Sequence, residues 1–506
     1  MNLTPAARLI FKGKVKEVAS WKGNEPRLQR ELLGRLLREA AHTDFGRRHG
    51  FGEMVADSSP ESLCHVFNRR VPLRGYEDFR ADVMRMIEGE KNVLWPGVCH
   101  NFAQSSGTTG GRSKYIPVTN ASLSRNHYKG ASYSVALYLN SNPESRMFAG
   151  KGLVLGGSFA NTVIKVRKGT LIGDLSATLI QRIYPLANMF RVPDKHTALL
   201  EDWEVKLPLL AKKAADADIT NISGVPSWMM RVILKVLEIK GCDSLKDVWP
   251  NLEVFFHGGI SFEPYRDEYK TLCRGLDMHW SEVYNASEGY FAVSDNSGAK
   301  GMLLLVDAGI YYEFLPLGSD EALGIDEVVP GKVYELIVSS VNGLWRYRTG
   351  DTVRVEGVDP VRITVAGRTK SFINAFGEEL MEDNAERALA EACRQSECSI
   401  HNYTVAPVYA HGEQRGRHQW IVEWKKAPAS IEGFTEVLDK ALRELNSDYD
   451  AKRSHDIFLD LPEVTGVAHG TFDRWLAANG SGKLGGQRKV PRLNNGREIA
   501  DAILAL

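Results

Sequence analysis

Residues 105–114 read SSGTTGGRSK, and Pro117 closes the segment. Glycines let the backbone turn tightly and present N–H groups to an anion. The hydroxyl side chains can donate hydrogen bonds to phosphate oxygens, and Lys114 adds a positive charge. A phosphate-binding loop is the functional interpretation, and a flexible surface turn is the alternative that composition alone leaves equally open. The segment is not a Walker A loop, because Arg112 stands where the second glycine of GxxxxGK[ST] is required.

The composition limits the classes of function. A chain of 506 residues predicts two or three domains, at roughly 100–200 residues per domain. Its 63 basic and 63 acidic residues cancel, so neither a nucleic acid nor an anionic membrane is indicated as its main partner. Its six cysteines have no zinc-site spacing and are typical of reduced thiols. Lys12 and Lys14 interrupt the first apolar stretch, and no apolar run approaches the ~18 residues of a membrane span. We therefore expect a cytoplasmic protein.

The pattern of apolar residues predicts an α/β protein. Leucines at helical spacing indicate an amphipathic helix over residues 25–41, followed by a turn around Asp44 and Gly46. Between about residues 100 and 350, short apolar strands end at glycines and precede helical stretches. Examples of such strands are residues 152–155, 252–256 and 333–339. Ligands of such layered domains usually bind at the carboxyl ends of the strands.

The last part of the chain has a different pattern. Strands are expected at residues 403–408, 420–424 and 457–459, and helices at residues 431–445 and 470–478. This order describes a small α+β unit. We expect a large N-terminal domain of layered sheets and helices at residues 1–370, and a small mobile C-terminal lid domain at residues 371–506.

The order SSGTTGxxxKxxP resembles the phosphate loop of acyl-adenylate-forming enzymes, and further motifs make the resemblance specific. The chain resembles the acyl acid–amido synthetase family, known from plants as auxin-responsive proteins and also present in bacteria. The shortness of the chain favours a bacterial member. The family belongs to the adenylate-forming (ANL) superfamily, together with acyl-CoA synthetases. The matching stretches are TDFGRRHGF (43–51), VPL and Tyr76 (71–76), SGVPSW (223–228), YNASE (284–288), YEFLP (312–316), GLWRYRTGD (343–351) and QRKVPR (487–492).

This resemblance implies an ATP-dependent ligase. Such an enzyme adenylates a small carboxylic acid, releases pyrophosphate, and passes the acyl group to an amino acid or other amine with release of AMP. ATP and Mg²⁺ are the implied cofactors. The ATP- and AMP-binding positions that it implies are Ser105, Ser106, Gly107, Thr108, Thr109, Lys114, Gly259, Tyr284, Ser287, Asp351 and Arg368.

Individual residues have a physical reason for these roles and an alternative. Glu288 beside a triphosphate would repel it unless a bridging Mg²⁺ intervened; the alternative is a carboxylate at a helix start. Tyr284 offers a flat face for adenine, or it is a core tyrosine. Asp351 can accept hydrogen bonds from both ribose hydroxyls, or it forms a turn after Gly350. Arg368 resembles the hinge-motif arginine of the superfamily, but Lys370 stands where an aspartate is frequent, which leaves the pivot open.

The catalytic lysine has two candidates. Lys483 lies in an SGK sequence like that of acyl-CoA synthetases, whereas Lys489 lies in the Q-x-K-x-PR tail of the amido synthetases. Alignment of the tail favours Lys489, which makes Lys483 a solvated loop residue. For the acyl pocket, Val225, Met229 and His257 are candidates near strand ends. Core packing is the alternative for Met229, and a structural role is the alternative for His257.

Three other functions compete with the amido synthetase. An acyl-CoA or aryl-CoA ligase shares the adenylation motifs and differs in its acceptor. A non-catalytic nucleotide-binding protein would have lost the phosphate loop, Glu288 or the lysine, and none of these is lost. A nucleic-acid-binding protein would carry a basic stripe, which the sequence lacks.

Overall fold

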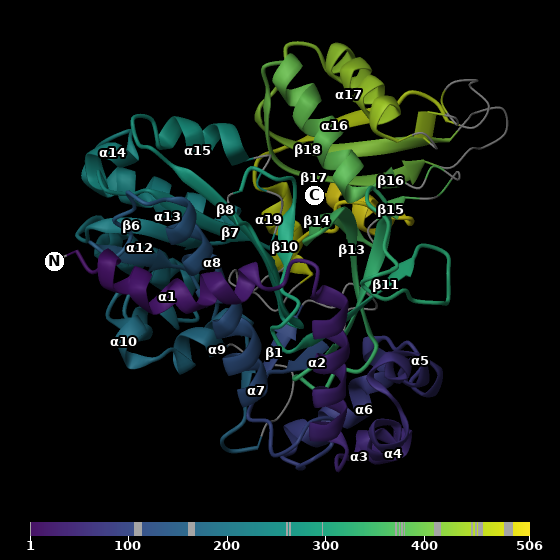
Figure 1. Cartoon of the computed structure of the whole chain (residues 1–506). Coiled ribbons are helices and arrows are strands. Elements are labelled where there is room, and N and C mark those ends of the chain that lie inside the picture. Colours follow the sequence, from purple (N-terminus) through teal and green to yellow (C-terminus); the bar gives the residue numbers. More distant parts are fainter. Residues whose placement is uncertain are drawn as a thin grey trace. The chain divides into compact units, whose positions relative to one another are not determined.

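The computed structural model of the chain is shown in Figure 1. It describes residues 2–105, 114–159, 167–259, 262, 265–295, 297–369, 372–373, 375, 378, 380–408, 416–446, 449–450, 453, 459–479 and 489–506. Two compact units divide the chain. The first comprises Met1–Thr349 and Val353–Thr364, and the second comprises Gly350–Thr352 and the described residues from Val365 onward. The domain boundary expected at residue 370 stays a prediction.

Six helices open the first unit: α1 (Thr4–Ala19), α2 (Glu25–Ala40), α3 (Asp44–His49), α4 (Phe51–Asp57), α5 (Pro60–Arg70) and α6 (Tyr76–Ile87). The helix predicted at residues 25–41 is confirmed as α2, whose buried leucines join the largest core cluster. The turn predicted around Asp44 and Gly46 is wrong. Residue Thr43 caps α3 instead, because its Oγ1 accepts a hydrogen bond from Gly46 N (3.0 Å).

An eleven-stranded sheet is the centre of the first unit, in the order β11-β12-β13-β14-β10-β9-β8-β7-β6-β3-β5. Strands β5, β3, β6, β7 and β8 are parallel, and β9 to β14 add antiparallel pairs. Their bounds are β3 (Lys151–Val154), β5 (Arg191–Val192), β6 (Ile219–Gly224), β7 (Val254–Gly258), β8 (His279–Ala286), β9 (Gly289–Val293), β10 (Met302–Leu304), β11 (Ile310–Pro316), β12 (Val333–Ser340), β13 (Tyr347–Val358) and β14 (Val361–Arg368). The strands expected at residues 152–155, 252–256 and 333–339 are therefore present.

Helices cover both faces of the parallel strands (Figure 1). On one face, α12 (Trp203–Ala215) and α13 (Pro226–Lys240) bury an apolar cluster that contains Trp249 and Phe255. On the other face, residues of α1 and α8 (Tyr128–Ser141) pack against Val254 and Phe256. The remaining helices are α7 (Asn120–Ser122), the π-helix η1 (Leu123–His127), α9 (Leu175–Arg182), α10 (Pro185–Asn188), α11 (Lys195–Ala198), α14 (Leu245–Val248) and α15 (Arg266–Leu272). A sheet between two helical layers is the expected α/β arrangement.

A second, three-stranded sheet in the first unit has the order β2-β1-β4, formed by β1 (Asn101–Ser105), β2 (Lys114–Pro117) and β4 (Leu171–Gly173).

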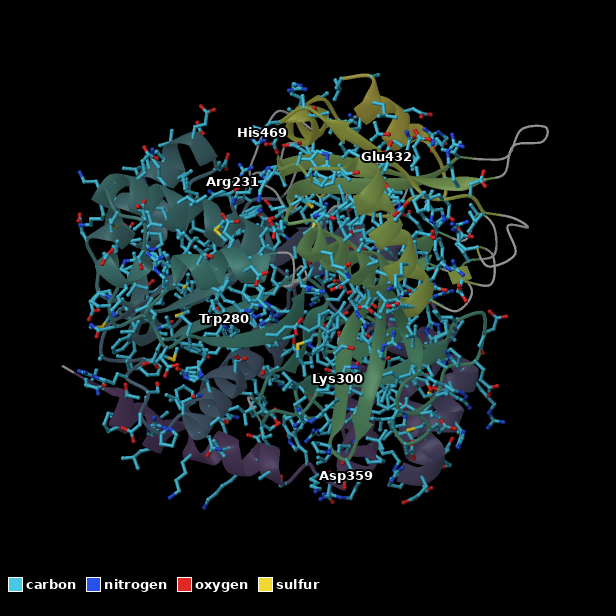
Figure 2. All side chains as sticks on the ribbon, turned by 90° about the horizontal axis from the view of Figure 1, so that it is seen from above. Arg231, Trp280, Lys300, Asp359, Glu432 and His469 are labelled. Carbon is cyan, nitrogen blue, oxygen red and sulfur yellow. The ribbon has the colours of Figure 1, made fainter. Side chains whose placement is uncertain are left out.

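In the large sheet, the turn between β13 and β14 lies at Asp359. Lys300 pairs with Glu356 on β13 (Nζ to Oε2, 2.9 Å); Figure 2 labels Lys300 and Asp359.

The second unit is a small α+β fold. Strands β17, β18 and β19 form its sheet, and α16 and α17 pack against apolar residues of β17 and β18. Its elements are β15 (Phe372–Ile373), β16 (Leu380–Met381), α16 (Glu382–Gln395), β17 (Ser399–Val408), β18 (Arg417–Lys426), α17 (Ile431–Leu445), β19 (Glu463–Val467), α19 (Thr471–Ala478) and α20 (Glu498–Leu504). The strands predicted at 403–408 and 420–424 and the helices predicted at 431–445 and 470–478 are found. Of the predicted strand at 457–459, only Leu459 lies within the described residues, as a bridge to Gly416. No helix in the described part of the chain is both long and apolar enough to cross a membrane.

Candidate active site

The predicted phosphate loop is the connection of a β-hairpin in the first unit. Strands β1 and β2 are antiparallel, and Ser105 pairs with Lys114 at the end of their register. Residue Tyr115 on β2 donates its N–H to the hydroxyl of Tyr76 on α6 (2.7 Å), which fixes the strand to the N-terminal helices. The predicted roles of Ser106, Gly107, Thr108 and Thr109, and that of the Ser105 side chain, lie outside the described residues.

The carboxyl ends of the parallel strands bring several predicted residues together. Gly224 at the end of β6 pairs with His257 on β7, and Gly258 pairs with Val283 on β8. A Cβ at Gly259 would lie 3.4 Å from Cγ2 of Val225, so these two residues are neighbours across adjacent strand ends. Residue Gly259 also has φ +81°, a backbone conformation that favours glycine. The predicted residues Val225, His257 and Gly259 therefore share one edge of the sheet, where α/β proteins bind ligands.

The His257 imidazole is neutral in its surroundings. It is buried, it stacks on Phe262 with ring centroids 4.3 Å apart, and its Nδ1 has no hydrogen-bond partner among the described residues. Burial, reinforced by the positive charge of Arg266, lowers the pKa of His257 to about 3. Residue Met229 on α13 is fully buried in the apolar cluster between α13 and the sheet, in agreement with the core-packing alternative.

A tight turn carries Ser287 and Glu288. The last pair of the β8–β9 hairpin is Ala286 with Gly289, so these two residues form the whole connection. The alternative that placed Glu288 at a helix start is therefore wrong. Residue Tyr284, near the end of β8, is buried with its ring edge-to-face to Phe291 (4.8 Å between centroids).

Asn342, which precedes β13, and Tyr347, the first residue of β13, hold Glu288. The backbone carbonyl of Glu288 accepts a hydrogen bond from Asn342 Nδ2 (2.8 Å). The hydroxyl of the buried Tyr347 donates to Glu288 Oε1 at 3.5 Å. Both the backbone and the half-buried carboxylate of Glu288 are thus tied to neighbouring elements.

Asp351 lies on β13 and Arg368 ends β14, and both residues belong to the parts of these strands that fall in the second unit. Residue Asp351 is buried on β13, directly after Gly350, which has φ +78°. Residue Thr369, which follows Arg368 at the end of β14, donates its N–H to Gly350 O (2.8 Å). The structure describes the backbone of Arg368 and not its side chain, and Lys370 lies outside the described residues.

The tail containing Lys489 is fixed along β17 within the second unit. Residue Val405 donates its N–H to Arg492 O (2.8 Å), and Thr404 Oγ1 donates to Pro491 O (2.6 Å). The guanidinium of Arg492 lies over the ring of Tyr403, 4.6 Å from its centroid. Lys489 is exposed immediately before this fixed stretch, and Lys483 lies outside the described residues.

Comparison with known proteins identifies the family. Sequence models of the GH3 family N-terminal, central and C-terminal domains match residues 14–278, 303–368 and 383–498. The first of these alone covers more than half of the chain. The chain belongs to the GH3 family.

Relatives and solved structures agree with this assignment. The chain is 25% identical to a probable indole-3-acetic acid-amido synthetase GH3.1 of Oryza sativa subsp. japonica, over 93% of this chain and 87% of the relative. It is 23% identical to indole-3-acetic acid-amido synthetase GH3.4 of Arabidopsis thaliana, over 93% of this chain and 89% of the relative. The resemblance to the amido synthetase family is confirmed, whereas a bacterial origin stays a prediction.

Structural similarity shows the fold. The structure of the GH3.15 acyl acid amido synthetase superposes with a TM-score of 0.79 at 19% identity, covering 97% of this chain and 95% of the other. A 2-hydroxyisobutyryl-CoA ligase in its postadenylation state superposes with a TM-score of 0.61 at 13% identity, covering 95% and 91%. The GH3 chain therefore has the adenylate-forming fold predicted from its sequence.

Two of the sequence motifs of this GH3 chain meet in a buried ion pair. In the first unit, Arg346 of the GLWRYRTGD stretch donates to both carboxylate oxygens of Glu313 in the YEFLP stretch, with Nη2 to Oε1 at 2.8 Å. Its Nη1 also donates to the carbonyls of Asn68 and Val71 (2.8 Å each). The motifs therefore anchor the segment that carries Tyr347 toward Glu288, a structural role that sequence reasoning missed because the partners lie far apart in the chain.

Sequence reasoning also missed a buried lysine at the sheet edge of the GH3 chain. The ammonium of Lys206 on α12 donates to Gly156 O (2.6 Å) and Gly157 O (3.3 Å), just after β3. Burial lowers its pKa to about 8. Residue Ser158 donates its N–H to Asp174 Oδ2 (2.9 Å). A lysine in an amphipathic helix is ordinarily read as a surface residue, so no local signal marks it.

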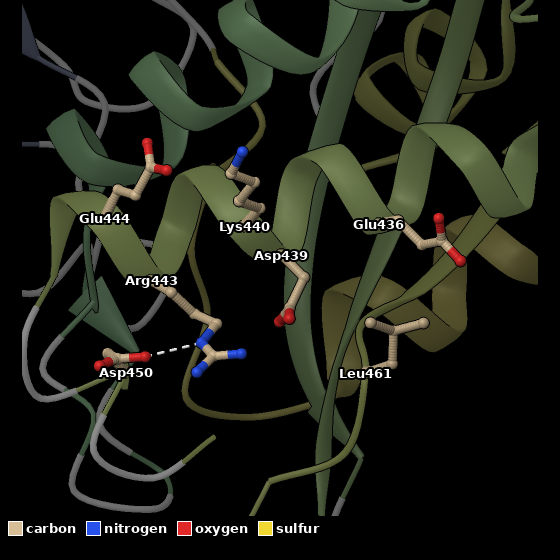
Figure 3. Close-up of a pocket in the computed structure, with 7 residues that line it drawn as sticks. All are labelled: Glu436, Asp439, Lys440, Arg443, Glu444, Asp450 and Leu461. Carbon is tan, nitrogen blue, oxygen red and sulfur yellow. Dashed lines mark hydrogen bonds and ion pairs between the residues drawn. The ribbon is translucent and has the colours of Figure 1, made fainter. Parts of the chain in front are cut away.

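A hollow of about 550 Å³ in the second unit contains none of the predicted residues (Figure 3). Its polar side chains are largely satisfied by one another and by neighbours. Residue Arg443 pairs with Asp450 (2.6 Å), and Asp439 accepts hydrogen bonds from Arg453 (2.7 Å) and the hydroxyl of Tyr449 (2.8 Å). We do not assign this hollow to the active site.

Proposed function

We propose that this chain is an ATP-dependent acyl acid–amido synthetase. In the first step, an oxygen of a carboxylic acid attacks the α-phosphorus of ATP, the bond to the β-phosphate breaks, and pyrophosphate leaves. In the second step, an amino acid amine attacks the acyl carbon, AMP leaves with the acid oxygen, and the amine proton is released. The observation that carries the proposal is the ordered coverage of the chain by the three GH3 domains. The names of the relatives, which are amido synthetases, support it.

Adenylation needs groups that bind the nucleotide and stabilise the charge on the migrating phosphate. For the phosphates we propose residues 105–109 and Lys114. Strand β1 ends at Ser105 and β2 begins at Lys114, so the proposed residues include both ends of the β1–β2 connection. For the nucleoside we propose Tyr284 and Gly259 at the sheet edge, Ser287 in the turn, and Asp351 and Arg368 on β13 and β14. The placement of Gly259, Tyr284 and Ser287 at the carboxyl ends of parallel strands supports these assignments.

Glu288 is the residue that would hold Mg²⁺. Its carboxylate is half-buried, accepts a hydrogen bond from Tyr347, and stands in a two-residue turn at the end of the β8–β9 hairpin. No group of three or more His, Cys, Asp or Glu side chains in the described part of the chain could enclose a metal. A single carboxylate from Glu288 fits Mg²⁺, because this ion is commonly held by one or two carboxylates together with substrate phosphates and water. The bound ion would neutralise charge on the phosphates.

The exposed Lys489 is the proposed lysine of the first step. It belongs to the second unit, whereas Glu288 and the β1–β2 hairpin belong to the first. We propose that the second unit rotates between the two steps, so that Lys489 acts on the phosphates during adenylation and withdraws before the amine attacks. The acyl group is proposed to lie by Val225 and His257, with Met229 packed behind them.

The second candidate function is a CoA ligase. The likeness to the 2-hydroxyisobutyryl-CoA ligase fold favours it, because that protein is also adenylate-forming. The two functions share the first step and differ in the nucleophile of the second.

The test supplies the protein with ATP, Mg²⁺ and a panel of carboxylic acids, and measures pyrophosphate release. Acids that give release are then incubated with either mixed amino acids or CoA, and the products are identified by mass spectrometry. An amide and AMP are expected. A CoA thioester as the only product would establish the second candidate, and the absence of pyrophosphate with every acid would contradict both. We further expect the enzyme to act in the cytoplasm, without nucleic acid or membrane partners.

A further inference from the structure

The π-helix η1 places two buried polar side chains beside the hairpin that carries Glu288. Residues Asn126 and His127 are consecutive, and each is about 1% exposed. No sequence motif marked either of them. Short π-helical turns insert one extra residue into a helix and are frequent at functional sites. Buried polar side chains need partners, and both residues find theirs on the two strands of the β8–β9 hairpin.

Asn126 holds the β9 side of the hairpin with its whole amide. Its Oδ1 accepts the N–H of Tyr290 (2.8 Å), and its Nδ2 donates to Tyr290 O (3.1 Å) and to Ala308 O (2.8 Å). A Cβ added at Gly289 would come within 3.4 Å of Asn126 Oδ1. The amide therefore fixes the backbone two residues after Glu288.

His127 holds the β8 side. Its Nδ1 lies 3.2 Å from Asn285 Oδ1, three residues before Glu288. Burial lowers the pKa of His127 to about 4, so the ring is neutral near pH 7. A neutral ring has one N–H, and the amide oxygen as partner places that hydrogen on Nδ1.

These contacts enclose the turn from both sides. The residues that Asn126 and His127 hold, Tyr290 and Asn285, are themselves a register pair of the hairpin. Between them stand only Ala286, Ser287, Glu288 and Gly289. Because the turn is only two residues long, the position of its backbone, and with it the Cα of Glu288, follows the two strands that Asn126 and His127 hold.

We propose that Asn126 and His127 are positioning residues, which hold the Ser287–Glu288 turn so that the Glu288 carboxylate meets the metal on the ATP phosphates. This inference rests on the proposed function. Neither residue touches the reacting atoms; they act through the hairpin, as residues behind a metal ligand do when they fix its orientation.

The test compares Asn126→Ala with Gln29→Ala as a matched control. The buried amide of Gln29 on α2 also makes three backbone hydrogen bonds, to Val306 O (2.7 Å), Ile310 O (3.0 Å) and Tyr312 N (2.8 Å). Both variants are expected to lower the melting temperature by a similar amount. ATP binding is measured by calorimetry with and without Mg²⁺. The metal-dependent gain in ATP affinity should fall roughly tenfold or more in Asn126→Ala and stay at the wild-type value in Gln29→Ala.

His127 is tested by a conservative and a disruptive variant. His127→Asn keeps an N–H near the position of Nδ1, whereas His127→Leu removes it. The gain in ATP affinity that Mg²⁺ provides should be largely retained in His127→Asn and lost in His127→Leu. A readout without nucleotide is amide hydrogen exchange in residues 285–290, which should accelerate in Asn126→Ala and His127→Leu and not in Gln29→Ala.

The outcomes separate this inference from the proposed function. A wild-type protein that binds ATP equally with and without Mg²⁺ would overturn the metal role of Glu288, and the inference with it. A wild type with a clear metal-dependent gain, together with equal responses of Asn126→Ala and Gln29→Ala, would overturn the inference alone. If the metal-dependent gain in ATP affinity were equal in His127→Asn and His127→Leu, His127 would not be a positioning residue.

Discussion

At the scale of single residues, the buried ion pair of Arg346 and Glu313 gives a prediction for the stability of the protein. Both side chains are nearly inaccessible, at 6% and 1% exposure. Arg346→Met should lower the free energy of unfolding by about 3–5 kcal/mol, because it leaves a buried carboxylate unpaired. Denaturant unfolding measures the loss.

Two further variants make this prediction specific. Arg35→Met breaks the pair with Asp307 (3.0 Å), in which the arginine is 53% exposed, and should cost less than about 1 kcal/mol. Glu313→Leu combined with Arg346→Met should recover part of the loss, since no buried charge is left alone. An Arg346→Met protein as stable as Arg35→Met would show that the pair does not hold the segment.

His257 gives a prediction for pH. The pKa of the folded imidazole is about 3, below the ordinary value of 6.5, because of burial. Between these values the unfolded chain binds the proton more readily, so stability falls as pH falls from 6.5 toward 3. From pH 6.5 to 4 this residue should account for a loss of about 3 kcal/mol, at ~1.4 kcal/mol per pH unit.

The variant His257→Phe can keep the stack on Phe262 and removes the titrating group. Unfolding measured from pH 6.5 to pH 4 should show a shallower decline for this variant than for the wild type. The exposed His65, changed to Phe, serves as control and should leave the decline as it is in the wild type. Parallel curves for His257→Phe and the wild type would contradict the burial of a neutral imidazole.

The residues of the candidate site could be predicted where a short motif carries them, and not where the contact is long-range. Glu288, Tyr284 and Lys489 were named from their motifs. The use of Asn126 depends on Tyr290, which is 164 residues away, and nothing in the local sequence marks that partner. The pairing of Arg346 with Glu313, which are 33 residues apart, is hidden for the same reason.

At the scale of elements, the tail stretch along β17 determines where Lys489 emerges. The amide of Asn494 donates to Thr404 Oγ1 (2.8 Å) and Val405 O (3.1 Å), which holds the stretch to the strand. Asn494→Ala should loosen this attachment, because it removes at most three hydrogen bonds, each of which contributes about 1 kcal/mol. The rate of pyrophosphate release should fall while the affinity for ATP changes little.

Rapid-quench kinetics and equilibrium ATP binding measure the two quantities separately. Asn479→Ala, which removes a side-chain bond to Trp475 O (3.0 Å) at the exposed end of α19, is the control and should leave the rate unchanged. If Asn494→Ala released pyrophosphate at the wild-type rate, the attachment of the tail to β17 would not be needed to present Lys489.

Elements with a strong apolar period were predictable, and short ones were not. The leucine spacing of α2 and the pattern of α17 each fill one face of a helix, so the period is visible in the sequence. The helix α3 has six residues, and Gly46 within it suggests a turn. Its stability comes from the Thr43 cap and from the burial of Phe45, which are not periodic signals. The π-helix η1 has no sequence signature of its own.

At the scale of the whole molecule, the fold could be predicted because motifs of one family follow one another along most of the chain. The order of strands in the large sheet could not, since it depends on pairings between distant segments such as β10 with β14. In the proposed mechanism, the position of Lys489 relative to the nucleotide depends on the rotation of the second unit, which no motif encodes.

The proposed rotation predicts a different role for Lys489 in each step. Lys489→Ala should slow adenylation by a factor of about 10²–10³, the usual cost of losing one stabilising charge on a transition state. The same variant, given chemically prepared acyl-adenylate and an amino acid, should form amide at close to the wild-type rate. Single-turnover kinetics of each step measures this. Lys483→Ala should behave as the wild type in both; full adenylation by Lys489→Ala together with its loss in Lys483→Ala would reverse the assignment.

The acyl-adenylate itself is tested most directly with a carboxylic acid labelled with ¹⁸O in both carboxylate oxygens, turned over with ATP and an amino acid acceptor. The acid oxygen that attacks the α-phosphorus must remain with that phosphorus when the amine displaces the nucleotide. We predict one ¹⁸O atom in the phosphate of each AMP formed, detected by mass spectrometry. AMP without label, or label in inorganic phosphate beside ADP, would contradict the account.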